Sequence, residues 1–122
     1  MRFPNWRDGP IAIVGQTGVF AGAIAHDVME SKTQRLGVRA SLAIGNRAGV
    51  NEADFLAALD ADEAVSVIGL YLESFADGGA FLNEAGRVKT RKPVILLKSG
   101  RTPDGARAAA SHTGSLATDD AV

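Results

Sequence analysis

The chain of 122 residues contains no cysteine, which excludes disulfide bonds, thiolate catalysis and cysteine-based zinc sites. Its two histidines, His26 and His112, stand too far apart to form a local metal motif, so no metal site is expected. No apolar run approaches the roughly 20 residues needed to cross a bilayer, and the start of the chain lacks the apolar stretch of a signal peptide. These absences predict a cytoplasmic protein with no membrane partner.

Neither sign of charge dominates, because 13 Lys and Arg residues face 14 Asp and Glu residues and the net charge is −1. A nucleic-acid-binding surface needs a clustered basic excess, and none is present, so no nucleic-acid partner is expected. With 46% hydrophobic and 22% charged residues, the composition is typical of a folded domain. The length predicts a single domain over residues 1–122. Because the last residues carry no helix stop signal, we expect a fragment of a longer multidomain chain.

Aromatic residues make up only 6% of the chain, and short apolar runs alternate with segments of helical periodicity. The runs typical of buried strands are residues 11–14, 38–44, 65–72 and 93–97. Helices are expected at residues 19–35, after Asn51, and at residues 77–92. This order predicts an α/β fold, an open parallel sheet with right-handed crossovers and helices on both faces. The polar segment after residue 97 is predicted to be a loop, with a further helix starting near Ser115.

Helix starts and helix faces can also be predicted. Asn51 and Asp77 are suited to cap the helices that follow them. The spacing turns His26 away from the core and toward solvent. The residues predicted to face the core are Phe20, Ile24 and Val28 in the first helix, Phe55, Leu56 and Leu59 in the second, and Phe81, Leu82, Ala85 and Val88 in the third.

Ligands of open α/β sheets bind beyond the carboxyl ends of the strands, where residues 15–18, 73–79 and 98–115 are predicted to lie. Residues 15–18 (Gly-Gln-Thr-Gly) join a strand to a helix, whose free N–H groups are suited to bind a phosphoryl group. Neither the P-loop pattern nor the dinucleotide pattern is present. A turn that requires glycine for its backbone alone explains the same residues equally well.

His112, within Ser-His-Thr-Gly-Ser, is expected in a reachable polar loop, where an imidazole can attack phosphorus, act as a base or bind a metal. A single loop histidine more often has no catalytic role. Glu73 directly follows the third strand and could accept a hydrogen bond from one imidazole nitrogen, leaving the other free to attack. Without such a partner it is an ordinary solvated acid. Three basic residues either neutralise a phosphate or are solvated: Lys98, Arg101 and Arg107.

Taken together, these stretches resemble the second domain of the NDP-forming acyl-CoA synthetases, which are relatives of the succinyl-CoA synthetase α subunit. The first stretch, GPIAIVGQTG at residues 9–18, is similar to a family segment that usually ends in Ser-Gln-Ser-Gly. The most specific stretches are PVILLKSGR at residues 93–101 and SHTGSLA at residues 111–117, which look like the family's phosphohistidine segment. Gly45-Asn46 and Leu70-Tyr-Leu-Glu73 also match, so the resemblance covers residues 9–117.

The resemblance implies a flavodoxin-like domain of an acid–thiol ligase that relays a phosphoryl group between a nucleotide and an acyl phosphate. His112 would carry the phosphoryl group and Glu73 would orient the imidazole. The phosphate-binding residues implied are Gln16, Thr17, Gly18, Ser111, Thr113 and Gly114. The domain itself is expected to bind no cofactor. CoA, Mg²⁺ and ATP or another NTP would bind to neighbouring domains.

Those neighbours would be a CoA-binding Rossmann domain and an ATP-grasp domain, in the same chain or a separate subunit, and the substrate would be a small carboxylic acid. Neither domain fits in 122 residues, so the chain alone is expected to be inactive. Gly15 stands where the family usually has Ser, so one hydroxyl donor is missing. Two alternatives stay open: a flavin- or nucleotide-binding module, disfavoured by the few aromatics, and a regulatory domain without catalysis, disfavoured by the presence of both His112 and Glu73.

Overall fold

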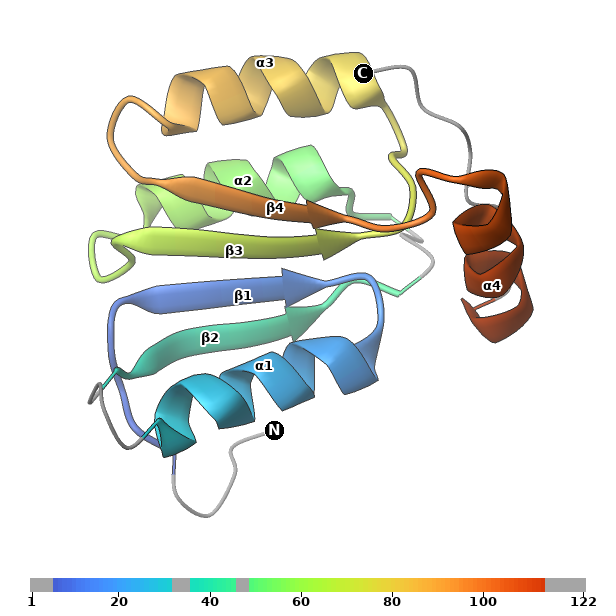
Figure 1. The fold of residues 1–122 in the computed structure, drawn as a ribbon. Helices are drawn as coiled ribbons and strands as arrows, with labels where there is room; N and C mark the ends of the chain where they lie inside the picture. The colour runs from blue at the N-terminus through green and yellow to red at the C-terminus, as the bar shows by residue number, and fades with distance from the viewer. Residues whose placement is uncertain (1–5, 32–35, 46–48, 114–122) are drawn as a thin grey trace.

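The computed structural model describes residues 6–31, 36–45 and 49–113, with the backbone alone for residues 109–113. In these residues strands and helices alternate along the chain, as Figure 1 shows. The elements are β1 (Ile11–Gly15), α1 (Gly18–Glu30), β2 (Val38–Ala43), α2 (Glu52–Ala61), β3 (Val67–Leu72), α3 (Gly78–Val88), β4 (Val94–Lys98) and α4 (Pro103–Thr113). No helix within the described ranges is long and apolar enough to cross a membrane.

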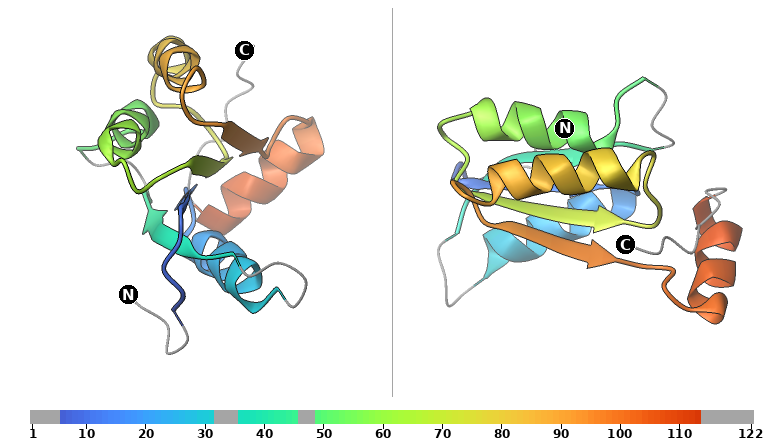
Figure 2. Two further views of the ribbon diagram at one scale, coloured as in Figure 1. Left: turned by 90° about the vertical axis from the view of Figure 1, so that its left-hand side faces the viewer. Right: turned by 90° about the horizontal axis from the view of Figure 1, so that it is seen from above.

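The described strands form one parallel sheet in the order β2-β1-β3-β4, which confirms the predicted fold class. Helix α1 covers one face of this sheet, and α2 and α3 cover the other (Figures 1 and 2). Side chains of β1 alternate between the two faces because successive residues of a strand point to opposite sides. Ala12 and Val14 accordingly join the core under α2 and α3, while Ile13 joins the core under α1.

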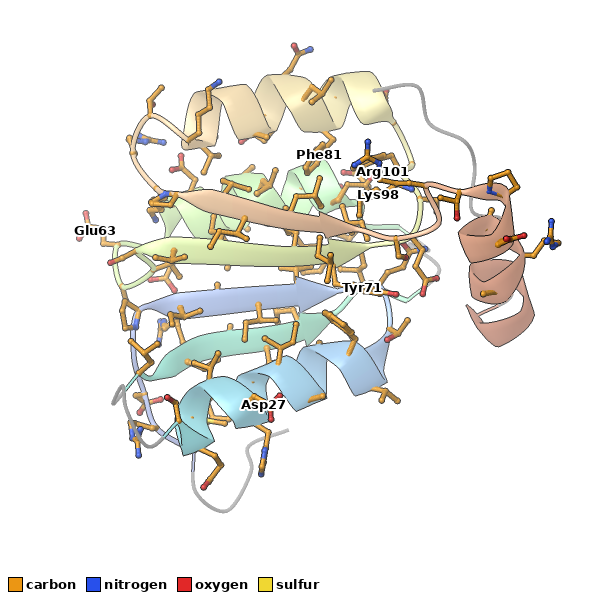
Figure 3. The ribbon with its side chains drawn as sticks, in the orientation of Figure 1. Asp27, Glu63, Tyr71, Phe81, Lys98 and Arg101 are labelled. Carbon is orange, nitrogen blue, oxygen red and sulfur yellow. The ribbon has the colours of Figure 1, made fainter. Side chains whose placement is uncertain are left out.

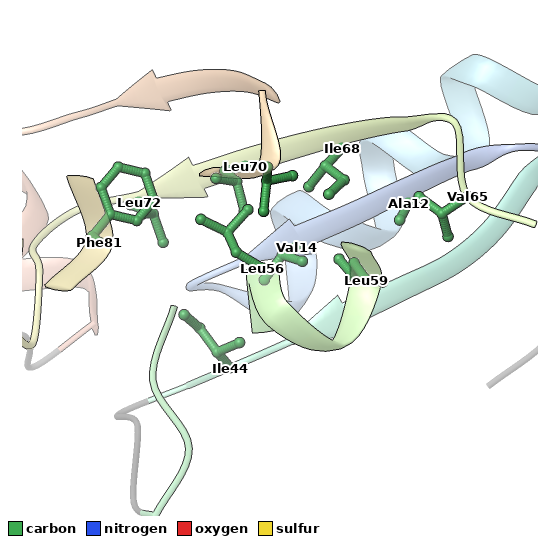
Figure 4. Packing of buried hydrophobic residues seen from close by; sticks show 11 residues of the cluster. Ala12, Val14, Ile44, Leu56, Leu59, Val65, Ile68, Leu70, Leu72 and Phe81 are labelled. Carbon is green, nitrogen blue, oxygen red and sulfur yellow. The ribbon is translucent and has the colours of Figure 1, made fainter. Parts of the chain in front are cut away.

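The larger core lies between the sheet and helices α2 and α3 (Figure 4). It contains Leu56 and Leu59 of α2 and Phe81 and Val88 of α3, which confirms these predicted core positions. Leu82 was also predicted to face the core, but 51% of its surface is exposed. The buried face of α3 is therefore narrower than the face that its apolar residues predict.

The smaller core lies under α1, and here the predicted face was wrong by one position. The fully buried residues of the helix are Ala21, Ala25 and Met29, whereas Ile24 and Val28 pack only at the margin of this core. Alanine allows the helix to approach the sheet closely: a β-carbon added at Gly15 would lie 2.9 Å from Ala21 Cβ. Periodicity alone favours larger apolar side chains and misses this close approach.

Strand β4 was predicted to be buried, and the structure contradicts this. Ile95 is 62% exposed, Leu96 40% and Leu97 53%. Among the described strands β4 pairs only with β3 and lies at the edge of the sheet. An apolar strand sequence fits an interior position, but its burial depends on which elements cover it.

The helix starts follow the predicted capping chemistry. Asn51 caps α2 in a full capping box, accepting from the N–H groups of Ala53 and Asp54 while Asp54 accepts from the Asn51 N–H. The Asp77 carboxylate caps α3 by accepting from Ala80 N–H at 2.9 Å. Short polar side chains at this position satisfy N–H groups that have no partner within the helix.

The segment after β4 was predicted to be a loop, but helix α4 begins at Pro103. Gly100, with a φ of 73°, turns the chain out of β4 into a conformation that favours glycine. The Thr102 hydroxyl then accepts from Gly105 N–H, and Pro103 is well suited to the first helical position. The prediction of a loop relied on the polar composition of the segment, although the alanines after Pro103 are strong helix formers. Helix α4 lies beyond the carboxyl ends of the strands (Figures 1 and 2).

Candidate functional site at the carboxyl edge of the sheet

The carboxyl ends of the strands carry the polar residues on which a site can be built. Figure 3 places Tyr71 and Lys98 at this end of the sheet, far from Glu63 at the opposite end. The segment of residues 73–77, here called the β3–α3 loop, lies at the centre of this edge. It connects Leu72, the last residue of β3, to Gly78, the first of α3. Side chains from three other elements hold it.

Gln16, from the β1–α1 turn, holds the start of the β3–α3 loop. The residue is 4% exposed, and its side-chain Oε1 accepts from the N–H groups of Glu73 at 2.8 Å and Ser74 at 3.2 Å. Its Nε2 donates to Ser74 Oγ at 3.3 Å, and its backbone N–H donates to Tyr71 O at 2.9 Å. The Gln16 side chain thus joins the first turn to the loop that carries Glu73.

Glu73 itself is buried, with 2% of its surface exposed, so it is not the solvated acid of the alternative interpretation. Tyr71 Oη donates to Glu73 Oε1 at 3.3 Å, and the Tyr71 ring stacks on Phe20 at a centroid distance of 3.8 Å. Lys98 Nζ donates to the Glu73 carbonyl oxygen at 2.9 Å. The structure therefore fixes both the backbone and the side chain of Glu73. A carboxylate held in this way is suited to orient an imidazole.

Glu52, the first residue of α2, belongs to the same edge and was missed by the sequence analysis. Its residue is 1% exposed, and its Oε1 accepts from Ala76 N–H at 2.5 Å. An acid at a helix start is ordinarily explained by the helix dipole. Nothing in the sequence distinguishes Glu52 from Asp54, which is exposed and completes the capping box.

The N-terminus of α1 opens at this edge and was predicted to bind a phosphoryl group through Thr17 and Gly18. Thr17 caps the helix, its hydroxyl accepting from Phe20 N–H at 3.2 Å. Gly18 and Val19 are exposed, and their N–H groups precede the first intrahelical hydrogen bond. Exposed N–H groups at a helix start favour an anion. A β-carbon at Gly18 would be 3.7 Å from Ala43 Cβ, an ordinary contact distance, so there is room for a larger residue at this position.

Helix α4 brings His112 to the same end of the sheet. The backbone places Ser111, His112 and Thr113 in the last turn of α4, not in the expected loop, and Gly114 lies outside the described residues. Their phosphate-binding and catalytic roles stay predictions. The elements that carry Glu73, Thr17 and His112 thus share one edge, as the predicted sheet requires.

The three basic residues of this region differ in their surroundings. Lys98 is half-buried, donates to the carbonyl oxygens of Glu73 and Ser99, and lies 5.9 Å from the centre of the Phe75 ring. Arg101 is exposed near Lys98 (Figure 3). Arg107 is exposed on α4 and pairs with Asp104 one turn earlier. Arg101 is therefore better placed than Lys98 to meet an anion from solvent.

A cluster of charged residues around Asp60 lies at the opposite end of the molecule. Asp60 is 8% exposed and pairs with Arg87 and Arg91 beside a hollow between α2 and α3. A hydrogen bond from Arg87 lowers the pKa of Glu84, and the same bond raises the pKa of Arg87. Within the described ranges, no group of three or more His, Asp or Glu residues could hold a metal ion. The Asp60–Arg87 pair joins α2 to α3, and the cluster lies away from the carboxyl edge.

The fold and the edge define an open parallel α/β domain whose polar residues converge beyond the strand ends. Comparison with known proteins gives its family: the family model described as succinyl-CoA ligase like flavodoxin domain matches residues 8–122. The chain belongs to this family.

Several curated proteins are similar to the chain. It is 39% identical over 114 residues to the α subunit of acetate–CoA ligase (ADP-forming) I from Pyrococcus furiosus, covering 93% of this chain and 24% of that subunit. It is 40% identical over 118 residues to 4-hydroxybutyrate–CoA ligase (ADP-forming) from Nitrosopumilus maritimus, covering 95% of this chain and 16% of that protein. The chain thus spans a quarter or less of the length of these relatives.

Among solved structures, the dinucleotide-forming acetyl-coenzyme A synthetase 1 of Ca. Korarchaeum cryptofilum, in complex with phosphate and ADP, matches with a TM-score of 0.76 and 40% identity. The match covers 91% of this chain and 24% of that one. PH0766 from Pyrococcus horikoshii matches with a TM-score of 0.67 and 28% identity, covering 95% of this chain and 26% of that one. The family and the fold thus agree.

Proposed function

We propose that the chain is the phosphohistidine-carrying domain of an NDP-forming acid–CoA ligase. The observation that carries the proposal is Glu73, a buried carboxylate held at the end of β3 by Gln16 and Lys98. It lies at the edge where α1 begins and to which α4 brings His112. The names of the similar proteins, which are ADP-forming ligases of acetate and 4-hydroxybutyrate, support the reaction class.

In the proposed reaction, one nitrogen of the neutral His112 imidazole attacks the γ-phosphorus of an NTP. A nitrogen–phosphorus bond forms, the bond to the bridging oxygen breaks, and NDP leaves. The other imidazole N–H donates to the Glu73 carboxylate, which stabilises the positive charge that develops on the ring. The helix start at Thr17 and Gly18 stabilises the negative phosphoryl oxygens.

The second half returns the histidine to its starting state. A carboxylate oxygen of the acid substrate attacks the phosphorus, the nitrogen–phosphorus bond breaks, and an acyl phosphate forms. The CoA thiolate then attacks the acyl carbon, the carbon–oxygen bond breaks, and inorganic phosphate leaves with acyl-CoA as product. The net reaction converts acid, CoA and NTP into acyl-CoA, NDP and phosphate.

The partners belong to the proposal as well. A CoA-binding domain and an ATP-grasp domain, in the same chain or in a separate subunit, bind CoA, nucleotide and Mg²⁺. The share of each relative covered by the chain, 24% or less, leaves room for both. The phosphate contacts of Gln16, Ser111, Thr113 and Gly114 and a cytoplasmic location are part of the same proposal.

The test is the intact mass of the complete ligase that contains this chain, measured after incubation with ATP and Mg²⁺. We expect one added phosphoryl group at neutral pH that is lost in acid and absent from His112→Asn. Acyl-CoA formation without phosphorylation would remove His112 from the mechanism. If neither phosphorylation nor acyl-CoA formation occurs, the binding-module and regulatory interpretations become the better ones.

A further inference from the structure

Glu52 is an acid whose burial the helix dipole does not explain. A carboxylate stabilises the start of a helix while exposed to solvent, and Asp54 on the same first turn does so. Glu52 is instead 1% exposed and directed at the β3–α3 loop, where it accepts from Ala76 N–H at 2.5 Å. Burying a charge is unfavourable unless hydrogen bonds compensate it. The position of this carboxylate therefore serves the loop rather than the helix.

The β3–α3 loop is held at both of its ends. Gln16 and Lys98 bind its first residues, Glu73 and Ser74, through hydrogen bonds of 2.8 to 3.3 Å. Glu52 binds its far end at Ala76, one residue before the Asp77 cap of α3. Between the two ends, the Phe75 ring packs against Phe81 at 4.8 Å. The anchor from α2 thus restrains the side of the loop that Gln16 and Lys98 do not reach.

We propose that Glu52 is a positioning residue that orients Glu73 through the β3–α3 loop. This inference rests on the proposed function, since it assigns Glu73 the task of holding the His112 imidazole. Without the Glu52 acceptor, the Ala76 N–H loses this hydrogen bond and the loop loses its anchor to α2. Glu73 keeps its own contacts with Gln16, Tyr71 and Lys98, but the loop that carries it is restrained less, so its carboxylate meets the imidazole for a smaller share of the time. Small misplacements of a catalytic group cost up to about 100-fold in rate.

The acceptor and the charge of Glu52 can be separated by substitution. Glu52→Gln keeps an oxygen that can accept from Ala76 N–H, and Glu52→Ala removes it. In the complete ligase at saturating ATP and Mg²⁺, we expect Glu52→Ala to phosphorylate His112 about 10- to 100-fold more slowly. The ATP concentration for half-maximal rate should stay unchanged, because the proposed nucleotide site lies in another domain. Glu52→Gln should stay within about threefold of the parent rate, like the control Glu63→Ala, an exposed acid at the opposite end.

A double-mutant cycle shows whether Glu52 acts through Glu73. The loss in Glu52→Ala/Glu73→Gln should equal the loss in Glu73→Gln alone, because a residue that works through another adds nothing once that one is gone. Additive losses would overturn the proposal. Equal losses in Glu52→Ala and Glu52→Gln would also overturn it, because the charge rather than the hydrogen bond would then be required.

Hydrogen exchange separates this inference from the proposed function. Amides of residues 73–77 should exchange faster in Glu52→Ala than in the parent or Glu52→Gln, whether or not His112 is ever phosphorylated. Unchanged exchange in Glu52→Ala would overturn the anchoring role, whereas absent phosphorylation in the parent would overturn the proposed function alone. If Glu52→Ala does not fold, Glu52→Asp replaces it in the kinetic, double-mutant and exchange experiments, because the aspartate side chain is one methylene shorter.

Discussion

Polar residues at the carboxyl edge are largely engaged with one another, and this changes what each can do. Gln16 shows the change most clearly, because its side-chain oxygen binds two loop N–H groups and its backbone N–H binds Tyr71. A sequence motif identifies such a residue only as polar and near a turn. The structure adds that its side chain carries part of the support for Glu73.

Gly15 gives a prediction at the residue scale. The similar family motif usually has serine here, yet a β-carbon at Gly15 would lie 2.9 Å from both Ala21 Cβ and Thr17 O. Neither atom is at the end of a flexible side chain, so α1 must shift to admit the new atom. We expect Gly15→Ser to destabilise the protein by about 1–3 kcal/mol.

The measurement for Gly15 is the free energy of unfolding in urea. Gly86→Ser is the matched control, because a β-carbon there has open space around it. A Gly15→Ser variant as stable as the parent would show that α1 moves outward at little cost.

At the element scale, a lysine from another part of the chain binds the C-terminal end of helix α2. Lys92 Nζ donates to the carbonyl oxygens of Leu59, Asp60 and Asp62 at 2.7 to 2.8 Å. These carbonyls lie at the C-terminal end of the helix, where carbonyl groups have no intrahelical partner and a cation is favoured. Lys92, which precedes β4 in sequence, therefore ties α2 to the segment that follows α3.

Replacing Lys92 by methionine should show this contribution, because methionine keeps an unbranched side chain and loses the ammonium group. We expect Lys92→Met to lower the free energy of unfolding by about 1–3 kcal/mol. Lys89→Met, at an exposed position on the same segment, should change it little. A similar urea midpoint in the two variants would contradict the role of Lys92.

Asp62, directly after α2, should make the stability of the fold depend on pH. The pKa of Asp62 is lowered below its ordinary value of 3.8, mainly by the hydrogen bond from Ala64 N–H and then by the one from Arg39. A carboxyl whose pKa is lower in the folded state stabilises the fold above its unfolded pKa, and this contribution is lost as the pH falls through the folded value.

We therefore expect the parent to lose more stability than Asp62→Asn when the pH is lowered from about 5 to 2. Thermal unfolding midpoints across this range measure the difference, with Glu30→Gln, an exposed acid on α1, as the control. Parallel midpoint curves for the parent and Asp62→Asn would contradict the assignment.

For the whole molecule, the exposed apolar residues of β4 are the main feature that the sequence did not reveal. Edge strands with apolar side chains promote association between chains. Ile95 and Leu97 pair in register with Gly69 and Tyr71, so they share one face of the sheet. Both are more than half exposed.

We expect the variant Ile95→Lys/Leu97→Glu, with the chain produced by itself, to associate less than the parent. Size-exclusion chromatography over a range of concentrations measures this, with circular dichroism to verify folding. Val19→Lys is the control, because Val19 is 82% exposed but lies at the start of α1 and not on an edge strand. Equal association of the parent and the double variant would show that β4 does not drive it.

The strands and the helix caps could be predicted from the sequence because they depend on near neighbours. Asn51 and Asp77 act on N–H groups two or three residues away, and a short apolar run bounded by glycine, such as residues 11–14, is typical of a buried strand. Helix α4 was missed because Pro103 is both a loop residue and a good first residue of a helix. For the site, the sequence predicted the edge of the sheet on which Glu73 lies, but not the contacts that hold Glu73 there.

Local interactions in the sequence therefore determined the order of the elements as far as β4, the parallel sheet and the edge at which Glu73 lies. Tertiary structure alone decided which side of α1 is buried, that β4 is exposed, and that Gln16 and Glu52 hold the loop of Glu73. These contacts join residues 24 to 58 positions apart in the chain. Periodicity and short motifs describe only neighbours along the chain, whereas burial and long-range hydrogen bonds depend on what the completed fold brings together.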